Sequence, residues 1–406
     1  MKLIGKIAAL ALSVATTCAA GDVVKSLAGE WRVTGDALSG VVHLPGTLAD
    51  AKLGTHKTAA DWEKDTNRAS KGALTREYQY IGKAVYEREI TLTEEEARYP
   101  LELVMERVML HSELAIDGET VGSFNSLAVE HVYPIPQRLT KPGRHTIRLT
   151  LDNSNRYNFS EWSHSYGPVM QSVWHGVVGQ LALRRQSPLR QSRVFASWPA
   201  NGRLLVEVPE EFEAKEGSVT LARAGKTASV QQQVEVIAKR PSPYRKGCNI
   251  VELKLGREPE SWSEHHPNLY TLTLRDVAAD FTHEIRFGFR SVAAHDHAIW
   301  INGIKWFMRG NLDCCHFPFT GAPDTTKAWW REMLRKLRDE DGINTLRFHS
   351  WTPPQAAFDA ADEMGMFCVV EAGIWQDRWM HSERLGVGRP IDTFTQRELR
   401  AILEKR

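Results

Sequence analysis

Charged, amide and aromatic residues follow three short apolar segments in the C-terminal quarter of this 406-residue chain. The apolar segments are residues 305–308, 343–348 and 366–370, and each is a strand candidate. Guanidinium, carboxylate and amide groups suit the hydroxyls of a polyhydroxylated ligand, and aromatic faces suit its ring. The predicted ligand-binding residues are Arg309, Asn311, Asp313, His316, Arg347, His349, Trp351, Glu371 and Trp375.

Some of these residues also allow other interpretations. Arg347 and Glu371 could form a structural ion pair, and Glu371 alone could serve as a general acid or base. Cleavage of a sugar linkage normally needs two carboxylates, about 5–5.5 Å apart when the configuration is retained. Glu371 is the one well-placed carboxylate, and Asp313 is a weak second. The residues by themselves therefore do not supply a catalytic pair.

Cys314, Cys315 and His316 stand next to one another and could suggest a metal site. Adjacent side chains point in opposing directions, however, and this spacing fits no standard ligand pattern. No metal and no other cofactor is therefore expected. Cys248, Cys314, Cys315 and Cys368 are too scattered to make a disulfide framework.

Helical patterns alternate with the three strand candidates. Apolar residues at i, i+3, i+4 and i+7 from Trp330 predict a helix that Gly342 closes. Thr352 is expected to cap a second helix with Pro353 at its first position. This order predicts a parallel α/β unit, whose working residues follow the carboxyl ends of the strands. About 100 residues belong to it, against about 250 for a complete (β/α)₈ barrel, so an incomplete barrel is expected.

Two regions of short strands precede this unit. Residues 27–183 alternate apolar and polar side chains, and Asp117-Gly118 predicts a hairpin turn there. A sandwich or jelly roll is expected from this pattern. Residues 186–289 repeat it with about six strands, one of them at 230–237, which is the size of an immunoglobulin-like sandwich.

The first twenty residues differ from the rest. A basic start, an apolar run at 7–15 and small residues before Gly21 are typical of a secretory signal peptide, and the run is too short to span a membrane. Cleavage is expected after Ala19 or Ala20, and a lipidated Cys18 is the alternative.

The formal net charge is +1, and no long block of like charge predicts binding to nucleic acid or to a membrane surface. The chain is therefore expected to be exported, without membrane insertion after signal cleavage.

A series of motifs runs through nearly all of the expected mature chain. The motifs are residues 27–31, 44–48, 84–88, 171–179, 266–270 with Trp262, 288–290, 301–303, 309–311, 344–347 and 362–366. Each is weak to moderate alone, but the ordered set is specific. In this order the chain resembles glycoside hydrolase family 2, the group that contains β-galactosidases, β-glucuronidases and β-mannosidases.

The resemblance implies a domain order as well as an activity. Residues 1–20 would be the signal peptide, 21–185 a sugar-binding jelly roll, 186–290 an immunoglobulin-like β-sandwich, and 291–406 the N-terminal part of a (β/α)₈ catalytic barrel. It implies a retaining exo-β-glycosidase that acts on an oligo- or polysaccharide. A periplasmic or extracellular location in a bacterium is expected with it.

The resemblance also implies where catalysis would sit. Arg347 and Glu371 would help to build the sugar site. The family's acid/base Glu and nucleophile Glu belong to later strands, so both are expected beyond Arg406, and the 406 residues alone are expected to be inactive. In some members the carboxylate at the position of Glu371 binds magnesium together with a His two residues later. That position is Gly373 here, so no metal is expected.

Two non-enzymatic hypotheses compete with this one. A non-catalytic carbohydrate-binding protein would use the jelly roll, with Trp162, Tyr166 or Trp174 as sugar platforms. A structural module would use the two β regions as spacers. An in-frame continuation with two further Glu-bearing strand ends would favour the hydrolase.

Overall fold

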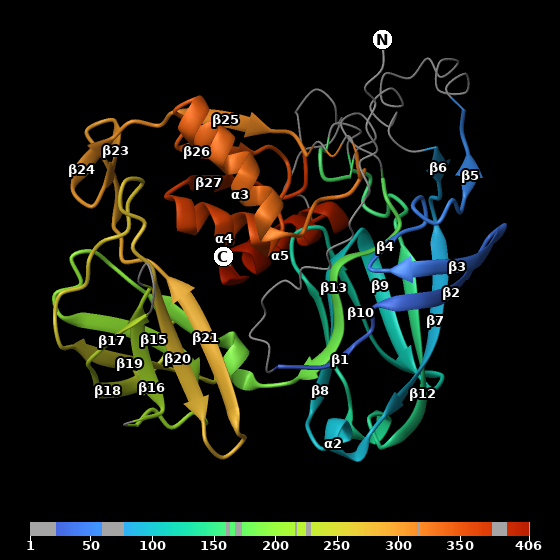
Figure 1. Cartoon of the computed structure of the whole chain (residues 1–406), viewed down its shortest axis with the longest axis horizontal. Helices are drawn as coiled ribbons and strands as arrows, with labels where there is room; N and C mark the ends of the chain where they lie inside the picture. Colours follow the sequence, from blue (N-terminus) through green and yellow to red (C-terminus); the bar gives the residue numbers. More distant parts are fainter. Residues whose placement is uncertain are drawn as a thin grey trace, which may run out of the picture.

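The computed structural model describes residues 22–58, 77–159, 163–166, 173–215, 217–224, 229–315, 317, 319–375 and 388–405. These residues form mainly β-sheets with few helices, as the sequence predicts (Figure 1). The expected signal peptide at 1–20, including Cys18, lies outside the described residues.

Two antiparallel sheets enclose the core of the first β region. One has the order β10-β9-β12-β7-β2-β3, and the other has the order β1-β13-β8-β11 with β4 paired to β13. Buried residues from both sheets, such as Trp31 and Leu183, belong to one cluster. The elements are β1 (Val23–Ser26), β2 (Gly29–Gly35), β3 (Leu38–Leu44), β4 (Gly46–Thr47), the separate pair β5 (Thr55–His56) and β6 (Tyr78–Gln79), β7 (Lys83–Leu92), the short helix α2 (Glu94–Ala97), β8 (Leu101–Val108), β9 (Leu110–Ile116), β10 (Glu119–Ser126), β11 (His131–Pro134), β12 (Gly143–Asp152) and β13 (Gly176–Arg185).

Side-chain alternation and turn chemistry explain these strands. In β12, Ile147, Leu149 and Leu151 point to the core and are each at most 1% exposed. Asp117 and Gly118 both have positive φ angles, 52° and 83°, between β9 and β10. The predicted hairpin turn is therefore confirmed.

Two four-stranded antiparallel sheets form the second β region. Their orders are β14-β15-β19-β18 and β17-β16-β20-β21, and one cluster of buried residues lies between them. The prediction of a single strand at 230–237 is wrong. The chain changes sheets at Gln233, because β17 pairs with β16 and β18 pairs with β19. The strands are β14 (Arg193–Phe195), β15 (Arg203–Pro209), β16 (Val219–Arg223), β17 (Val230–Gln232), β18 (Val234–Pro241), β19 (Cys248–Leu255), β20 (Tyr270–Asp276) and β21 (Phe281–Phe287).

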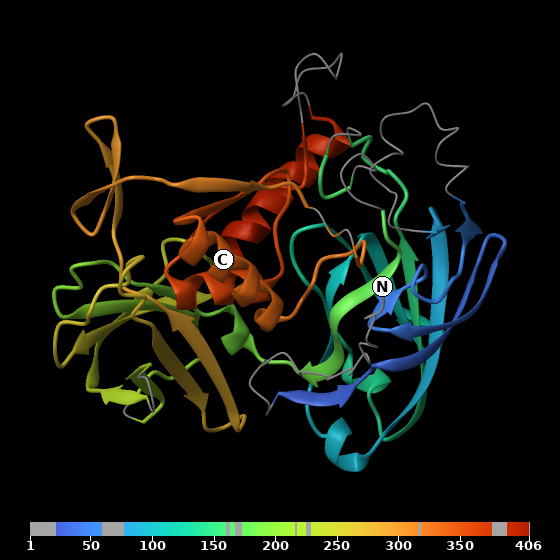
Figure 2. The same ribbon diagram turned by 45° about the horizontal axis from the view of Figure 1, so that its top comes forward.

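A three-stranded antiparallel sheet, β22 (Val292–His295), β23 (Ala298–Ile301) and β24 (Ile304–Trp306), links this region to the α/β unit. It projects from the molecule in both ribbon views (Figure 2). The prediction that 305–308 is the first parallel strand is wrong. Asn302 and Gly303, with φ angles of 52° and 76°, make a tight turn that folds β24 back onto β23.

The α/β unit begins with β25 (Gly310–Asp313), which pairs in parallel with β26 (Thr345–Phe348), and β26 pairs with β27 (Phe367–Val370). Helix α3 (Lys327–Arg335) continues as a π-helical turn, η4 (Lys336–Glu340), before β26, and α4 (Gln355–Met364) connects β26 to β27. Buried residues of α3, α4 and the sheet, including Trp330 and Leu346, form one cluster. Within the described residues the parallel sheet has three strands and does not close into a barrel.

The predicted start of the second helix is wrong. Helix α4 begins at Gln355, after Pro354 in an extended conformation with a ψ of 160°. A helical start at Pro353 is disfavoured because the ring of Pro354 clashes with a preceding residue in the α region. The Thr352 hydroxyl instead donates to the backbone carbonyl of Glu371 at 3.1 Å.

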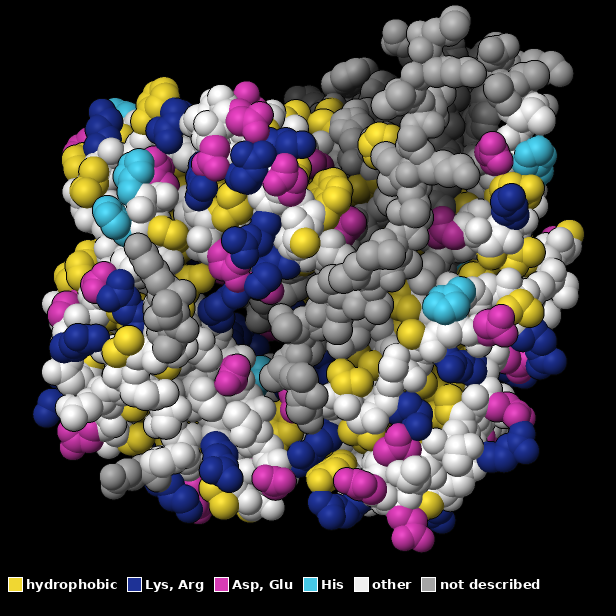
Figure 3. Space-filling model, viewed as in Figure 1, with side chains coloured by type: hydrophobic (Ala, Val, Ile, Leu, Met, Phe, Trp, Pro, Cys, Tyr) yellow, Lys and Arg dark blue, Asp and Glu magenta, His cyan; other side chains and the backbone are white. Residues whose placement is uncertain are grey.

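Helix α5 (Pro390–Lys405) packs against the first β region, where Ile402 shares a small apolar cluster with Ala128 and Val129. The α/β unit also contacts the second β region, where Arg286 of β21 pairs with Glu363 of α4 at 2.7 Å. Its strand ends lie near the first β region, where the Ser165 N–H donates to Ser350 O. No helix among the described residues is long and apolar enough to cross a membrane. Basic and acidic side chains are interspersed over the face shown in Figure 3.

Candidate sugar-binding site

Glu371 follows β27 and accepts hydrogen bonds from three residues. Its Oε1 accepts from Arg347 Nε at 2.7 Å and forms an ion pair with Arg347 Nη2 at 2.5 Å. Its Oε2 accepts from the Ser350 N–H at 2.7 Å and lies 3.0 Å from His349 Nδ1. An ionised carboxylate only accepts, so His349 Nδ1 carries the hydrogen of this bond. Three predicted ligand-binding residues, Arg347, His349 and Glu371, are thus brought together.

Strand register explains this meeting. Phe348 of β26 stands opposite Val370 of β27, so the residues that follow each strand meet at the same edge of the sheet. Ser350 has a φ of 54°, an uncommon value for a residue with a side chain, and its N–H is directed at Glu371. Such strained positions cluster at binding and catalytic sites.

The environment of Glu371 favours the ionised carboxylate. Burial by itself raises the pKa of Glu371, but the hydrogen bonds from Ser350, His349 and Arg347 outweigh burial, and the pKa lies below its ordinary value. Glu371 is therefore suited to accept hydrogen bonds from hydroxyl groups. The same shift makes it a poor proton donor near neutral pH.

Three aromatic rings form a corner beside Glu371. The centroid of the Trp375 ring lies 4.5 Å from that of His349 and 5.4 Å from that of His164. His164 also stands edge-on to His349 at 4.6 Å, and its Nδ1 lies 2.8 Å from the His349 carbonyl. This corner joins an aromatic platform to the polar cluster, the combination expected for a sugar site.

His164 belongs to the first β region, and the sequence reasoning did not find it. The Ser165 N–H donates to Ser350 O at 3.2 Å, and Ser165 Oγ donates to Gly373 O at 2.8 Å. The Trp375 N–H donates to Ser163 Oγ at 2.9 Å. Segment 163–166 therefore docks on the two strand-end segments, although no local pattern marks it.

Gly373 is required by this docking. A Cβ at position 373 would collide with Ser165 Oγ and would lie 3.3 Å from Leu127 Cδ1. The space that a side chain at position 373 would need is thus filled by Ser165 and Leu127. No group of three or more potential metal ligands occurs in the described part of the chain.

Two predicted site residues lie elsewhere. Arg309 precedes β25 and bonds Gly342 O at 2.7 Å and Glu264 Oε1 at 3.1 Å, at the amino end of the parallel sheet. Asn311 lies within β25, in an exposed position. Both predictions are wrong because the parallel strand begins at Gly310 rather than ending at Met308.

Asp313 and Trp351 lie near the predicted edge but have structural contacts. Asp313 Oδ1 accepts the Cys315 N–H at 2.8 Å, and Asp313 O accepts Trp351 Nε1–H at 3.3 Å. Trp351 is 3% exposed and packs edge-on against Phe348, so its predicted role as a sugar-facing ring is wrong. His316 lies outside the described residues.

The rings proposed for a sugar site in the first β region are buried. Tyr166 and Trp174 are each 6% exposed and share one apolar cluster with Phe394 of α5. The Tyr166 hydroxyl donates to Asn153 O at 2.5 Å. Neither ring offers an open face, and Trp162 lies outside the described residues.

Cys248, Cys314, Cys315 and Cys368 are free thiols.

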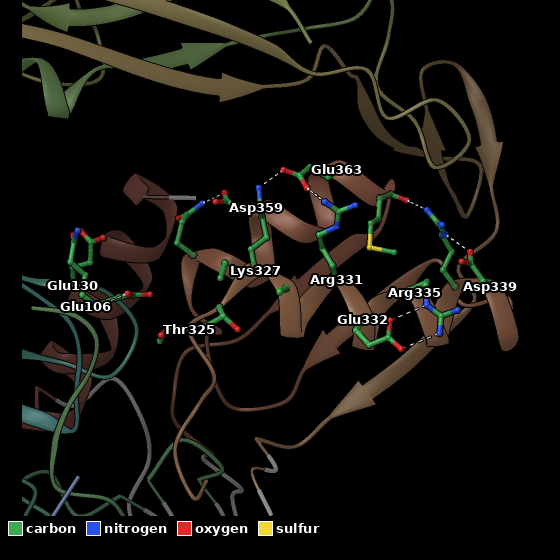
Figure 4. Close-up of a pocket in the computed structure, with 17 residues that line it drawn as sticks. Glu106, Glu130, Thr325, Lys327, Arg331, Glu332, Arg335, Asp339, Asp359 and Glu363 are labelled. Atoms are coloured by element: carbon green, nitrogen blue, oxygen red, sulfur yellow. Dashed lines mark hydrogen bonds and ion pairs between the residues drawn. The ribbon is translucent and has the colours of Figure 1, made fainter. Parts of the chain in front are cut away.

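A cleft of about 840 Å³ lies on the other side of the α/β unit, between α3, α4 and the first β region (Figure 4). Ion pairs such as Lys327–Glu363 at 2.8 Å and Arg335–Glu332 at 3.0 Å line it. No aromatic ring is among the described residues that line it. Among the described residues, the aromatic platform thus belongs to the strand-end site and not to this cleft.

Comparisons with known proteins find chains that are named as glycosidases. No family model matches the chain. A protein of Formosa agariphila named as a beta-glucuronidase is 21% identical over 311 residues, which cover 72% of this chain and 36% of that protein. The resemblance to glycoside hydrolase family 2 that the motifs predict is confirmed by this relative and by solved structures.

Two solved structures share the fold. Beta-glucuronidase 2 of Bacteroides uniformis superposes with a TM-score of 0.64 at 16% identity and covers 94% of this chain and 45% of that one. The family 2 beta-galacturonidase of Eisenbergiella tayi superposes with a TM-score of 0.62 at 17% identity, over 94% of this chain and 64% of that one. The chain thus spans from 36% to 64% of the length of these three proteins.

The contact between Gly373 and Ser165 can be tested by substitution. Gly373→Ala is expected to lower the free energy of unfolding by about 1–3 kcal/mol, because the added methyl overpacks the junction. Ser165→Ala in the same chain should restore part of this loss. Gly310→Ala is the matched control, because its nearest atoms lie 3.8 Å or more away, and its effect should be near zero. Urea unfolding measures all four proteins, and a fully stable Gly373→Ala protein would contradict the close contact.

The lowered pKa of Glu371 predicts a pH dependence of stability. Because the folded-state pKa lies below the unfolded value of about 4.3, the carboxylate stabilises the fold above that pH and loses this effect as the pH falls through the folded pKa. Calorimetry should show wild type melting above Glu371→Gln at pH 7. The gap should shrink below about pH 4. A gap that grows on acidification would show that Glu371 is protonated in the native state.

Proposed function

We propose that this chain holds the sugar-binding part of a retaining exo-β-glycosidase of the family 2 type, which acts in carbohydrate breakdown. The observation that carries the proposal is the cluster of Arg347, His349 and Glu371 beside the Trp375 ring. Charged groups in fixed geometry bind the hydroxyls, and the aromatic ring packs on the apolar face of the sugar. The class of sugar is proposed from the names of similar proteins, which include beta-galactosidases as well as uronidases: a β-linked hexose or hexuronic acid.

The proposed domains follow the sequence boundaries. Residues 21–185 would be a sugar-binding jelly roll, 186–290 an immunoglobulin-like sandwich, and 291–406 the first strands of a (β/α)₈ barrel. The two-sheet cores of both β regions and the parallel order β25-β26-β27 support this division. The leader-like pattern at 1–20 supports export to the periplasm or the outside of the cell.

The proposed catalytic carboxylates are two Glu residues beyond Arg406. Glu371 is held ionised by three residues, so it lacks the proton that a general acid must deliver. The Asp313 carboxylate accepts the N–H of Cys315 within its own turn. In this mechanism Glu371 and Arg347 orient the sugar. One later Glu would protonate the leaving oxygen, and the other would form the glycosyl-enzyme intermediate.

Hydrolysis of aryl β-glycosides tests the proposal. The 406-residue chain is assayed beside a chain extended in frame through further strands, with galactoside, glucuronide, mannoside and arabinoside substrates. The longer chain is expected to turn over one of them. In that chain Glu371→Gln should lower kcat/KM about 10–100-fold, the worth of a charge-assisted hydrogen bond, whereas Arg400→Ala on the exposed face of α5 should not.

Two other outcomes would change the assignment. Turnover by the 406-residue chain would contradict catalytic residues beyond Arg406 and would make Glu371 and Asp313 the pair to substitute. Sugar binding by both chains without any turnover would favour the non-catalytic carbohydrate-binding protein, with its site at the strand ends.

A further inference from the structure

Two buried side chains, Glu398 and Arg107, hold the turn after β10. The Leu127 N–H donates to Glu398 Oε2 of α5 at 3.0 Å, and Leu127 O accepts from Arg107 Nη1 of β8 at 2.9 Å. Glu398 is 1% exposed and Arg107 is 5% exposed. Backbone groups that are shielded from water need partners, and here both the N–H and the C=O of Leu127 take a side-chain partner.

Ser126 shapes the turn that presents Leu127. Ser126 Oγ accepts the N–H groups of Ala128 and Val129, each at 3.0 Å. This local pattern satisfies the turn's other donors, so Leu127 is the residue whose backbone reaches β8 and α5. Three elements that are distant in the sequence therefore meet at the backbone of one residue, Leu127.

The same residues touch both segments that carry the sugar site. Leu127 Cδ1 lies 3.3 Å from the place of a Cβ on Gly373, and Leu127 packs in one cluster with Ile374. The second guanidinium nitrogen of Arg107, Nη2, donates to Pro353 O. Segment 371–375 thus rests on the Leu127 side chain, and segment 349–353 is bonded to Arg107.

We propose that Arg107 and Glu398 are positioning residues of the sugar site, which act by clamping Leu127 between β8 and α5. The clamp fixes segments 349–353 and 371–375 against the first β region and thereby sets the places of His349 and Trp375. Neither clamp side chain touches the sugar. This inference rests on the proposed function, because positioning affects affinity only if those two residues bind the sugar.

Hydrogen exchange tests the clamp without any sugar. In the 406-residue chain, Glu398→Ala should speed amide exchange in 349–353 and 371–375 about tenfold, while the β15–β19 sheet stays unchanged. Glu398→Gln keeps an oxygen acceptor for the Leu127 N–H and should exchange like wild type. Arg400→Ala, at an exposed position of the same helix, is the matched control. Exchange in Glu398→Ala equal to wild type, or Glu398→Gln as fast as Glu398→Ala, would overturn the clamp.

A binding titration tests whether loss of the clamp weakens sugar affinity. The sugars are methyl β-D-glucuronide and methyl β-D-galactoside, and tryptophan fluorescence reports their binding. Glu398→Ala should weaken the affinity for the bound sugar about tenfold, and Glu398→Gln should stay within about twofold of wild type. Faster exchange with unchanged affinity would overturn the positioning role. If wild type binds neither sugar, the proposed function fails, and the exchange experiment still decides whether the clamp exists.

Discussion

The hydrogen bonds that converge on Glu371 fix the geometry of the whole strand-end site. A half-buried carboxylate is costly unless donors compensate for its lost hydration. Here Arg347, His349 and the Ser350 N–H supply them, so each of these groups is held in place by the same charge. The left-handed backbone of Ser350 and the orientation of the His349 ring both follow from this requirement.

The second constraint is steric and comes from another part of the chain. Segment 163–166 reaches the strand ends only because Gly373 leaves room for Ser165 Oγ. Through this contact His164 and Trp375 form one aromatic corner. The site is therefore shared between a β region and a parallel sheet, and neither has it alone. A loop on a rigid scaffold is a common place for binding residues.

Local patterns predicted the part of the site that depends on local structure. His349 and Glu371 could be found because parallel strands bring their carboxyl ends to one edge, whatever surrounds them. Arg309 was misplaced because the turn at Asn302 and Gly303 makes residues 304–306 an antiparallel strand. The first parallel strand therefore begins at Gly310, so Arg309 lies at its amino end. His164 could not be found, since its contact with His349 joins residues 185 positions apart and leaves no periodic signal.

A crystal structure of the chain soaked with the β-glycoside that it binds most tightly tests the central claim most directly. The account predicts a sugar ring packed on Trp375, with a hydroxyl within hydrogen-bond distance of the Glu371 carboxylate. A sugar bound instead in the ion-pair cleft between α3 and α4, with Glu371 and Trp375 untouched, would contradict it.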